Sequence, residues 1–135
     1  MVGANEPRSR PLSPHLQIYR QEINMVMSIV HRITGAALYV GTILLAWWLL
    51  AAASGPVYFD YVNGLWSSFL GRAVLLGYTW ALIHHALGGI RHLIWDSGRA
   101  LDIESVNRLC WMTILGSTTL TMVVWVVGYW MKGAF

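Results

Sequence analysis

Two adjacent histidines, His84 and His85, stand in the middle of a long apolar stretch of this chain. An ionisable side chain inside a bilayer is costly, by about 2.5 to 3.5 kcal/mol for a charged one at the centre of a helix. A neutral imidazole costs less, but its ring nitrogens still require partners where water is absent. The pair therefore indicates a hydrogen-bonding partner, a proton path or a metal, and imidazole is a common ligand of haem iron.

Small residues surround His85 on the helix that this stretch predicts. Counted from His85, positions i−8, i−4, i+3 and i+4 are Gly77, Ala81, Gly88 and Gly89. A flat macrocycle needs such clearance beside a helix that supplies the imidazole for its iron. Small residues also let helices approach one another closely, which is the plainer explanation of the glycines alone. Around an intramembrane histidine the pattern favours a haem ligand.

The neighbouring histidines have other expected roles. His84 points about 100° away from His85 around the helix and is expected to meet a neighbouring helix, since 3.6 residues make one turn. A shift of one residue would exchange the two, so spacing alone leaves the choice between them open. His92 shares a face with His85 but lies nearer water, where Asp96 can accept its proton. A second axial ligand, if the iron has six ligands, must come from elsewhere, and a partner helix is the economical source.

A second cluster lies earlier in the chain. Ser28, His31, Arg32 and Gly35 share one helical face by their spacing. The serine and the arginine suit a ligand with a polar head and an apolar body, because both can hydrogen-bond a carbonyl oxygen and the arginine stabilises charge as that oxygen is reduced. His31 and Arg32 can equally neutralise haem propionates. Each residue taken alone also has a plainer explanation: Ser28 as a residue at the start of a helix, and Arg32 as a basic anchor at the membrane surface.

Composition places the chain among all-α integral membrane proteins. Of its 135 residues, 56% are hydrophobic and 11% are charged, less than half the usual quarter. Charge-free windows predict three transmembrane helices, at about 29–53, 65–95 and 106–131, within a single domain spanning 1–135. Ser54-Gly55-Pro56 ends the first helix, and a loop is expected from there to Leu65. The lone Cys110 excludes a cysteine-ligated cluster in this chain.

Basic residues predict the orientation. They gather before the first helix and between the second and third, whereas the first loop has none, so the N-terminal tail 1–20 and the second loop are expected on the cytoplasmic side. The tail lacks the apolar core of a secretory signal, which favours a bacterial inner-membrane protein. The clustered basic residues are Arg8, Arg10, Arg20 and Arg32, then Arg91, Arg99 and Arg108.

The orientation also predicts which side chains share a depth. At a rise of 1.5 Å per residue, His85 lies about 9 Å from Arg91, in the cytoplasmic third of the bilayer. Ser28, His31 and Arg32 begin the first helix from the same side. These residues are therefore expected to lie at similar depths on neighbouring helices and to build one site.

Three segments resemble a known family. Residues 10–16 (RPLSPHL), 28–35 (SIVHRITG) and 85–98 (HALGGIRHLIWDSG) are similar to signatures of the cytochrome b membrane anchor of succinate dehydrogenase, respiratory complex II. The resemblance implies a three-helix bundle completed by a second small anchor subunit, with one haem b shared between them. It also implies a flavoprotein subunit and an iron–sulfur subunit, which hold FAD and the iron–sulfur clusters.

The resemblance assigns roles to individual residues. It implies His85 as the haem-iron ligand, Ser28 and Arg32 as quinone-binding residues, and His31 with Arg32 near the haem propionates. The expected function is membrane anchoring in succinate:ubiquinone oxidoreductase, with two-electron, two-proton reduction of ubiquinone in a cytoplasm-side pocket. This chain would contribute quinone contacts and one axial ligand, and would not be catalytic alone. Its partners are the other subunits, ubiquinone and membrane lipids, with no nucleic acid.

Three alternatives remain open from the residues. The first is the anchor subunit of a quinol:fumarate reductase, which runs the same chemistry in reverse. The second is a haem-free structural anchor that only recruits soluble subunits. The third is a transporter or proton-conducting subunit with histidine relays. Against the third, the central windows 33–53, 73–90 and 109–131 of the predicted spans contain no charged residue, no inverted repeat is visible, and three helices are too few for a pore.

Overall fold

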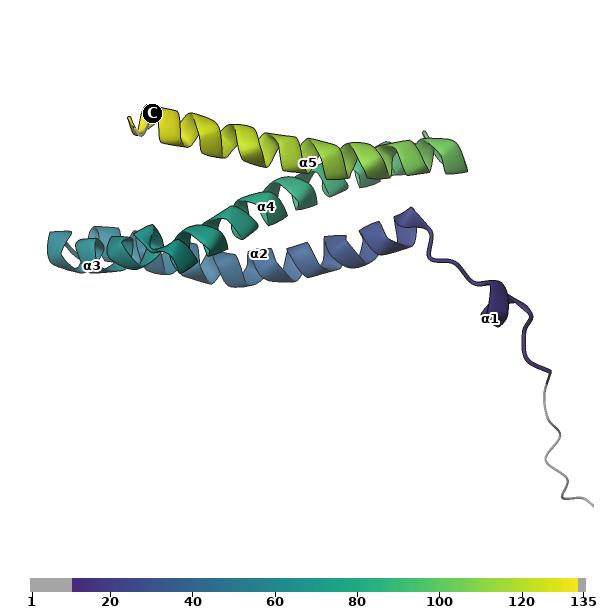
Figure 1. The fold of residues 1–135 in the computed structure, drawn as a ribbon, viewed down its shortest axis with the longest axis horizontal. Coiled ribbons are helices and arrows are strands. Elements are labelled where there is room, and N and C mark those ends of the chain that lie inside the picture. Colours follow the sequence, from purple (N-terminus) through teal and green to yellow (C-terminus); the bar gives the residue numbers. More distant parts are fainter. Residues whose placement is uncertain (1–10, 134–135) are drawn as a thin grey trace, which may run out of the picture.

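A long helix, α4, crosses between two others and forms the centre of the structure (Figure 1). The computed structural model describes residues 11–133, which contain five helices and no strand. The expected all-α class with three helices of transmembrane length is confirmed. In chain order, the helices are α1 (His15–Ile18), α2 (Ile23–Ala53), α3 (Pro56–Ser67), α4 (Phe69–Asp96) and α5 (Ile103–Met131).

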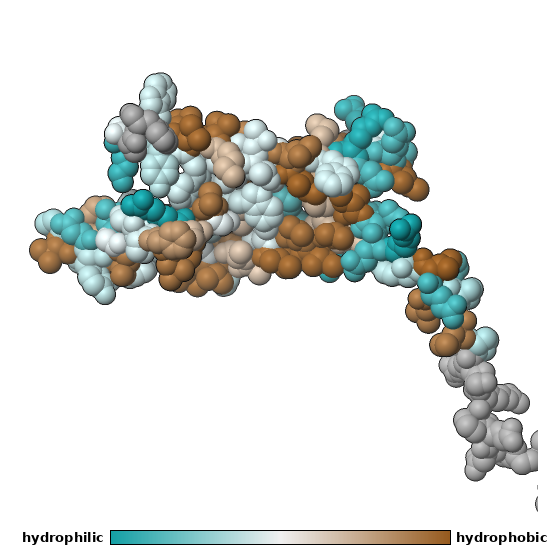
Figure 2. All heavy atoms as spheres, viewed as in Figure 1, coloured by the Kyte–Doolittle hydropathy of each residue, from teal (hydrophilic) through white to brown (hydrophobic). Residues whose placement is uncertain are grey.

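The three long helices have the dimensions of membrane spans. They contain 31, 28 and 29 residues, which corresponds to lengths of about 42 to 46 Å, more than the roughly 30 Å hydrocarbon core of a bilayer. Hydrophilic residues gather towards the two ends of the bundle, and hydrophobic residues cover much of its middle (Figure 2). The start of α2 and the α4–α5 connection lie at the same end (Figure 1). Arg8, Arg10 and the first ten residues of the expected tail lie outside the described residues.

The first connection differs from its prediction. A loop was expected from Ser54 to Leu65, but α3 occupies Pro56–Ser67. The expected end of the preceding helix is correct, because Gly55 at φ 113° reverses the chain in a conformation that favours glycine. Pro56 then occupies the first turn of α3, where its missing N–H would have had no helical partner. The absence of basic residues from this segment does not indicate whether it is a loop or a helix, so the loop prediction was wrong.

The central helix also begins later than predicted, at Phe69 instead of 65. The break falls at Ser68, whose extended backbone ends α3 and whose hydroxyl oxygen accepts a hydrogen bond from the Gly71 N–H at 3.1 Å. Gly71 lies so close to the backbone of Leu65 and Trp66 that a side chain there would collide with it. The corner therefore depends on Ser68 and Gly71. The other two long helices begin slightly earlier than predicted. Helix α2 begins at Ile23 rather than at residue 29, and α5 begins at Ile103 rather than at residue 106.

The bundle has a thin, partly polar interior and an apolar exterior. Few side chains are fully buried, and most are small or polar, whereas many large aliphatic and aromatic residues are exposed along the helices. This is the reverse of a water-soluble domain and is typical of membrane helices, whose contacts use small residues and hydrogen bonds. The buried polar side chains are Thr34, His84, Arg91, Thr113, Ser117 and Thr121.

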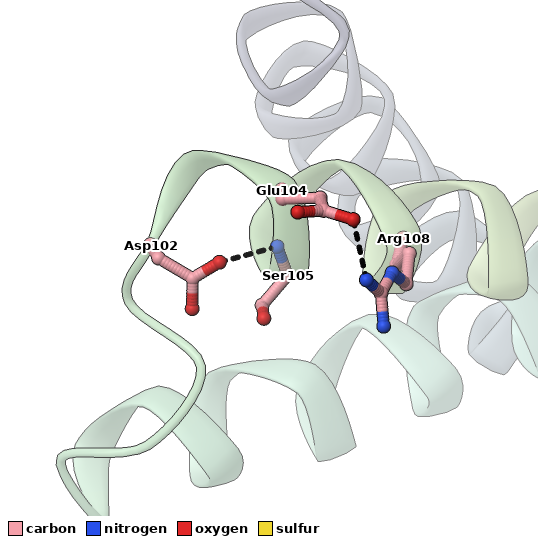
Figure 3. Close-up of polar contacts among 4 residues, drawn as sticks. All are labelled: Asp102, Glu104, Ser105 and Arg108. Atoms are coloured by element: carbon pink, nitrogen blue, oxygen red, sulfur yellow. Dashed lines mark hydrogen bonds and ion pairs between the residues drawn. The ribbon is translucent and has the colours of Figure 1, made fainter.

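The start of α5 is fixed by a capping interaction (Figure 3). An oxygen of Asp102 accepts a hydrogen bond from the Ser105 N–H at 2.9 Å, and an Arg108–Glu104 ion pair follows on the exposed face. The backbone N–H of Ser105 is the main reason that the pKa of Asp102 lies below its ordinary value of 3.8. The carboxylate therefore stays ionised, and the cap intact, until the pH falls below that value.

Replacement of Asp102 tests this cap. Asp102→Ala removes the acceptor of the Ser105 N–H and is expected to lower the melting temperature of the purified complex, whereas Asp102→Asn keeps an acceptor oxygen and most of the stability. Glu104→Gln is the control, because an ion pair between side chains 70% and 78% exposed contributes little. Equal melting temperatures for the alanine variant and the unmodified complex would contradict the capping role.

Candidate functional site

The α2–α4 contact brings two of the predicted site residues together. The ring of His85 on α4 stacks on the ring of His31 on α2, with centroids 3.9 Å apart and an interplanar angle of 4°. Both side chains are half-buried. His31 and His85 therefore lie at the same level of the bundle, as the sequence predicted, with His85 facing α2.

Hydrogen bonds to α2 determine which ring nitrogen of His85 is free. Its Nδ1 lies 3.1 Å from the backbone oxygen of His31 and 3.2 Å from the hydroxyl oxygen of Thr34. The Thr34 hydroxyl has its own acceptors, the carbonyl oxygens of Val30 and His31, each at 2.9 Å. The backbone oxygen can only accept, so Nδ1 carries the proton and donates it. Nε2 is then left with a lone pair, the arrangement found in metal-ligating histidines.

Thr34 is a site residue that sequence reasoning missed. It lies within the segment 28–35 that carries the family resemblance, but no role was assigned to it. The helical spacing places Thr34 near His31 without indicating which helix it faces. Thr34 is only 3% exposed. The contact of its hydroxyl with His85 can be recognised only once α4 is known to pack against α2.

His84 contacts a different neighbouring helix, α5, which agrees with the predicted contact with a neighbouring helix. It is 1% exposed, its Nδ1 lies 3.0 Å from the hydroxyl oxygen of Ser117 on α5, and its ring stacks on Trp80 at 4.7 Å. The Ser117 hydroxyl donates to the carbonyl oxygen of Ile114 at 3.0 Å, so it accepts from His84. A macrocycle could reach this ring only if α4 and α5 separated.

The expected pairing of His92 with Asp96 is wrong. Within residues 11–133 no hydrogen bond or ion pair joins them, and the ring of His92 instead lies 5.2 Å from that of His31 and 5.2 Å, edge-on, from that of Trp95. Helical spacing allowed the pair, but the aromatic neighbours draw the imidazole towards α2. His92 consequently joins the histidine cluster.

A groove of about 660 Å³ opens beside these histidines at the end of the bundle where α2 begins. Ser28 and Arg32 of α2 line one side, and His92 and Trp95 of α4 line the other. Ser28 is half-buried, whereas Arg32 is exposed and forms no ion pair among the described residues. The remaining lining residues are Tyr19, Gln21, Asn24, Met25, Ile29, Leu101 and Val106. The groove thus offers a cation and a hydroxyl beside apolar walls.

The small residues around His85 are not equivalent. A Cβ added to Gly77 or Gly89 would meet nothing within 4 Å, so clearance beside the helix is present at these two positions. Gly88 lies instead against the ring of His31, and Ala81 is buried. The prediction that all four leave room for a macrocycle is therefore wrong for Gly88, since α2 already fills that space.

Arg91 lies within α4, where only a flanking charge was expected. It is 3% exposed, with Nη1 3.7 Å from the Cys110 sulfur and the guanidinium carbon 5.2 Å from the centroid of the Trp95 ring. Its Nε is buried without a hydrogen-bond partner. The contact with Cys110 joins α4 to α5 near the α4–α5 connection, whereas the contact with Trp95 lies within α4.

The described residues contain no group of three or more histidine, cysteine, aspartate or glutamate side chains that could hold a bare metal ion. A haem asks less of this chain, because its porphyrin supplies four nitrogens and a single imidazole supplies an axial ligand. His85 meets that requirement by its free Nε2 and the open positions Gly77 and Gly89. The residues present therefore fit a haem.

Three membrane-length helices, an inward imidazole oriented by its second nitrogen, and an adjoining amphipathic groove are typical of membrane cytochrome subunits of redox complexes. Comparison with known families specifies this class. Residues 6–124 match the family described as the succinate dehydrogenase/fumarate reductase transmembrane subunit. The chain belongs to this family, as its motifs predicted.

Individual relatives agree with the family match. The chain is 43% identical to a succinate dehydrogenase cytochrome b556 subunit of Paracoccus denitrificans, over 88% of this chain and 92% of the relative. It is 38% identical to a protein of the same name in Rickettsia felis, over 87% and 91%. It is also 38% identical to a mitochondrial succinate dehydrogenase cytochrome b560 subunit of Sus scrofa, over 88% and 72%.

The structural role of His84 is testable through its partner. Ser117→Ala leaves the buried Nδ1 of His84 without an acceptor and is expected to destabilise the complex by about 0.6 kcal/mol, the average for hydrogen bonds between membrane helices, and by no more than about 1.7 kcal/mol. Thermal denaturation of the purified complex measures this, and Thr118→Ala, at an exposed neighbouring hydroxyl, is the control. The haem absorption spectrum should be unchanged; a lost spectrum would instead give His84 a part in ligation.

Proposed function

We propose that this chain is the cytochrome b membrane-anchor subunit of a succinate:ubiquinone oxidoreductase, and that it provides one axial ligand of haem b and part of the ubiquinone-reduction site. Membership of the family and the names of the relatives support the complex. One observation carries the haem assignment: the Nδ1 of His85 donates to the backbone of α2 and leaves Nε2 to ligate iron.

In this proposal, a haem would be held by residues of this chain together with a second small anchor subunit. When bound, the haem accepts and returns single electrons. His85 provides the iron ligand, and Thr34 with the His31 carbonyl fixes its tautomer and direction. Arg32 and His31 are proposed to contact the haem propionates. The Nδ1 of His31 is buried against Gly88, so Nε2 is the nitrogen available for that contact.

Ubiquinone is proposed to bind with its head group in the groove beside Ser28 and Arg32. The Ser28 hydroxyl and the Arg32 guanidinium donate hydrogen bonds to a ring oxygen, and the apolar side chains of Met25 and Ile29 contact the apolar part of the molecule. Reduction adds two electrons and two protons, which converts both carbonyl oxygens to hydroxyls. The arginine stabilises the negative charge that develops on oxygen before protonation.

The electrons come from partner subunits. A flavoprotein subunit with FAD oxidises succinate, and an iron–sulfur subunit transfers the electrons to the membrane. This chain has one cysteine, Cys110, which is buried in α5, so its own residues cannot ligate an iron–sulfur cluster. On its own it is therefore proposed to be an anchor without catalytic activity, completed by the second anchor subunit.

We also propose the location and direction of the reaction. The groove, the start of α2 and the α4–α5 connection share one end of the bundle, and most of the basic residues lie there. By the positive-inside rule this end faces the cytoplasm of a bacterium, where soluble subunits can dock. Succinate oxidation is favoured over fumarate reduction, because the three relatives compared with this chain are all named as succinate dehydrogenase subunits.

Substitution of the histidines tests the haem assignment. His85→Ala is expected to remove or strongly perturb the b-type haem spectrum of the purified complex, because it deletes the axial ligand. His84→Ala is the matched variant one residue away, on the α5 side of α4, and should retain the haem. Reduced-minus-oxidised absorption spectra of both complexes provide the measurement. Haem retained by His85→Ala but lost from His84→Ala would reverse the assignment.

Two substitutions test the quinone site. Ser28→Ala and Arg32→Leu are expected to lower succinate–ubiquinone reductase activity by a factor of about 100 to 1,000, the effect typical of removing a donor to a developing oxyanion. Succinate oxidation by an artificial dye should stay nearly normal, since it bypasses the membrane subunits. Gln21→Ala, on the same groove, serves as a control for mild disturbance of the lining. A parallel loss of both activities would indicate failed assembly instead.

A further inference from the structure

We propose that Gly35 and Gly88 are positioning residues that fix the plane of the His85 ring through reciprocal contacts between α2 and α4. The inference rests on the proposed ligation of haem by His85. Each helix contributes one histidine and one glycine: His31 of α2 packs on Gly88 of α4, and His85 of α4 packs on Gly35 of α2. The two rings stack on one another between the glycines.

The contacts at Gly88 leave no room for a side chain. A Cβ at this position would lie 2.5 Å from Nδ1 and 3.0 Å from Cε1 of His31. The first distance is far below van der Waals contact, so the imidazole would have to move. It is not free to do so in place, because its face lies on the ring of His85 and a third ring, that of His92, lies 5.2 Å away.

The contact at Gly35 is tight but less severe. A Cβ there would lie 3.1 Å from Cε1 of His85. Cε1 is the ring carbon bonded to both nitrogens, so a push on it turns the imidazole about its hydrogen bond to the His31 carbonyl. A shift of a few tenths of an ångström relieves the contact. The structure therefore predicts graded effects, with Gly88 the stricter position and Gly35 the milder one.

The ring plane matters because an axial imidazole interacts with iron through its π orbitals as well as its lone pair. The protein adjusts a haem through the orientation of its ligands and the hydrogen bonds that hold them. Here the Nδ1 hydrogen bonds fix one point of the ring, and the stacked His31 fixes its rotation. The glycines are what allow His31 and His85 to occupy those places.

Gly88→Ala, Gly35→Ala and the control Gly64→Ala, each in the assembled complex, test the proposal. Gly64 is exposed within α3, and an added Cβ there would meet nothing within 4 Å. Gly64→Ala therefore raises helix propensity as the other two substitutions do, but it introduces no contact with a histidine ring. We expect Gly88→Ala to shift the EPR g-values of the ferric haem and to weaken haem retention about tenfold, as other changes around metal ligands do. Gly35→Ala should give a smaller g-value shift, and Gly64→Ala none.

Removal of the His31 ring distinguishes the mechanism from general destabilisation. His31→Ala deletes the atoms that an alanine at position 88 would strike, so His31→Ala and the double variant His31→Ala/Gly88→Ala should give the same EPR spectrum. If Gly88→Ala alone fails to assemble, the double variant should assemble. An effect of Gly88→Ala that persists undiminished without the ring would overturn the proposal.

The outcomes also separate this inference from the proposed function. Haem retained with an unchanged spectrum in His85→Ala would refute the ligand assignment and the positioning role with it. Haem lost from His85→Ala, together with g-values unaffected by Gly88→Ala and Gly35→Ala, would leave the ligand assignment intact and refute only the positioning role.

Discussion

The hydrogen bond between Nδ1 of His85 and the backbone of α2 is the interaction on which the site depends. It joins the two helices that the site needs, selects the tautomer of the imidazole and leaves Nε2 available to a metal. A backbone carbonyl cannot change its role as an acceptor, so this choice is independent of any other side chain. Ser28 lies one turn before His31 on α2, which places the groove beside the histidine pair.

Two consecutive residues connect the central helix, α4, to its neighbours. His84 forms a hydrogen bond with α5 and His85 forms one with α2, and together they fix the rotation of α4 about its axis. In a membrane, where apolar helices gain little from exchanging lipid for one another, such polar contacts and close approach of small residues give the packing its specificity. Arg91 adds a second contact with α5, through the sulfur of Cys110. The site is thus built on rigid elements.

Helical periodicity and charge predicted the three spans and the shared depth of His31 and His85, because these follow from features repeated along the chain, whereas the family was predicted by the resemblance of three short motifs. Features that depend on two segments at once were missed. Spacing could not choose between His84 and His85, since it gives directions around a helix but not the neighbours that lie there. For the same reason, Gly88 was predicted to border open space, although the His31 ring of α2 fills it. The contact of Thr34 with His85 was not predicted at all. The corner at Ser68 was hidden within an apolar window.

The scarcity of buried side chains has a consequence for the life of the protein in the cell. Interior contacts of so few residues give the isolated chain little to resist unfolding within the lipid, while wide apolar faces stay available for association. Binding to the native form stabilises it by mass action. Newly inserted copies that find no companion would therefore open more often and fall to quality-control proteases sooner. The amount of this chain in the membrane would thereby follow the supply of any subunit that covers these faces.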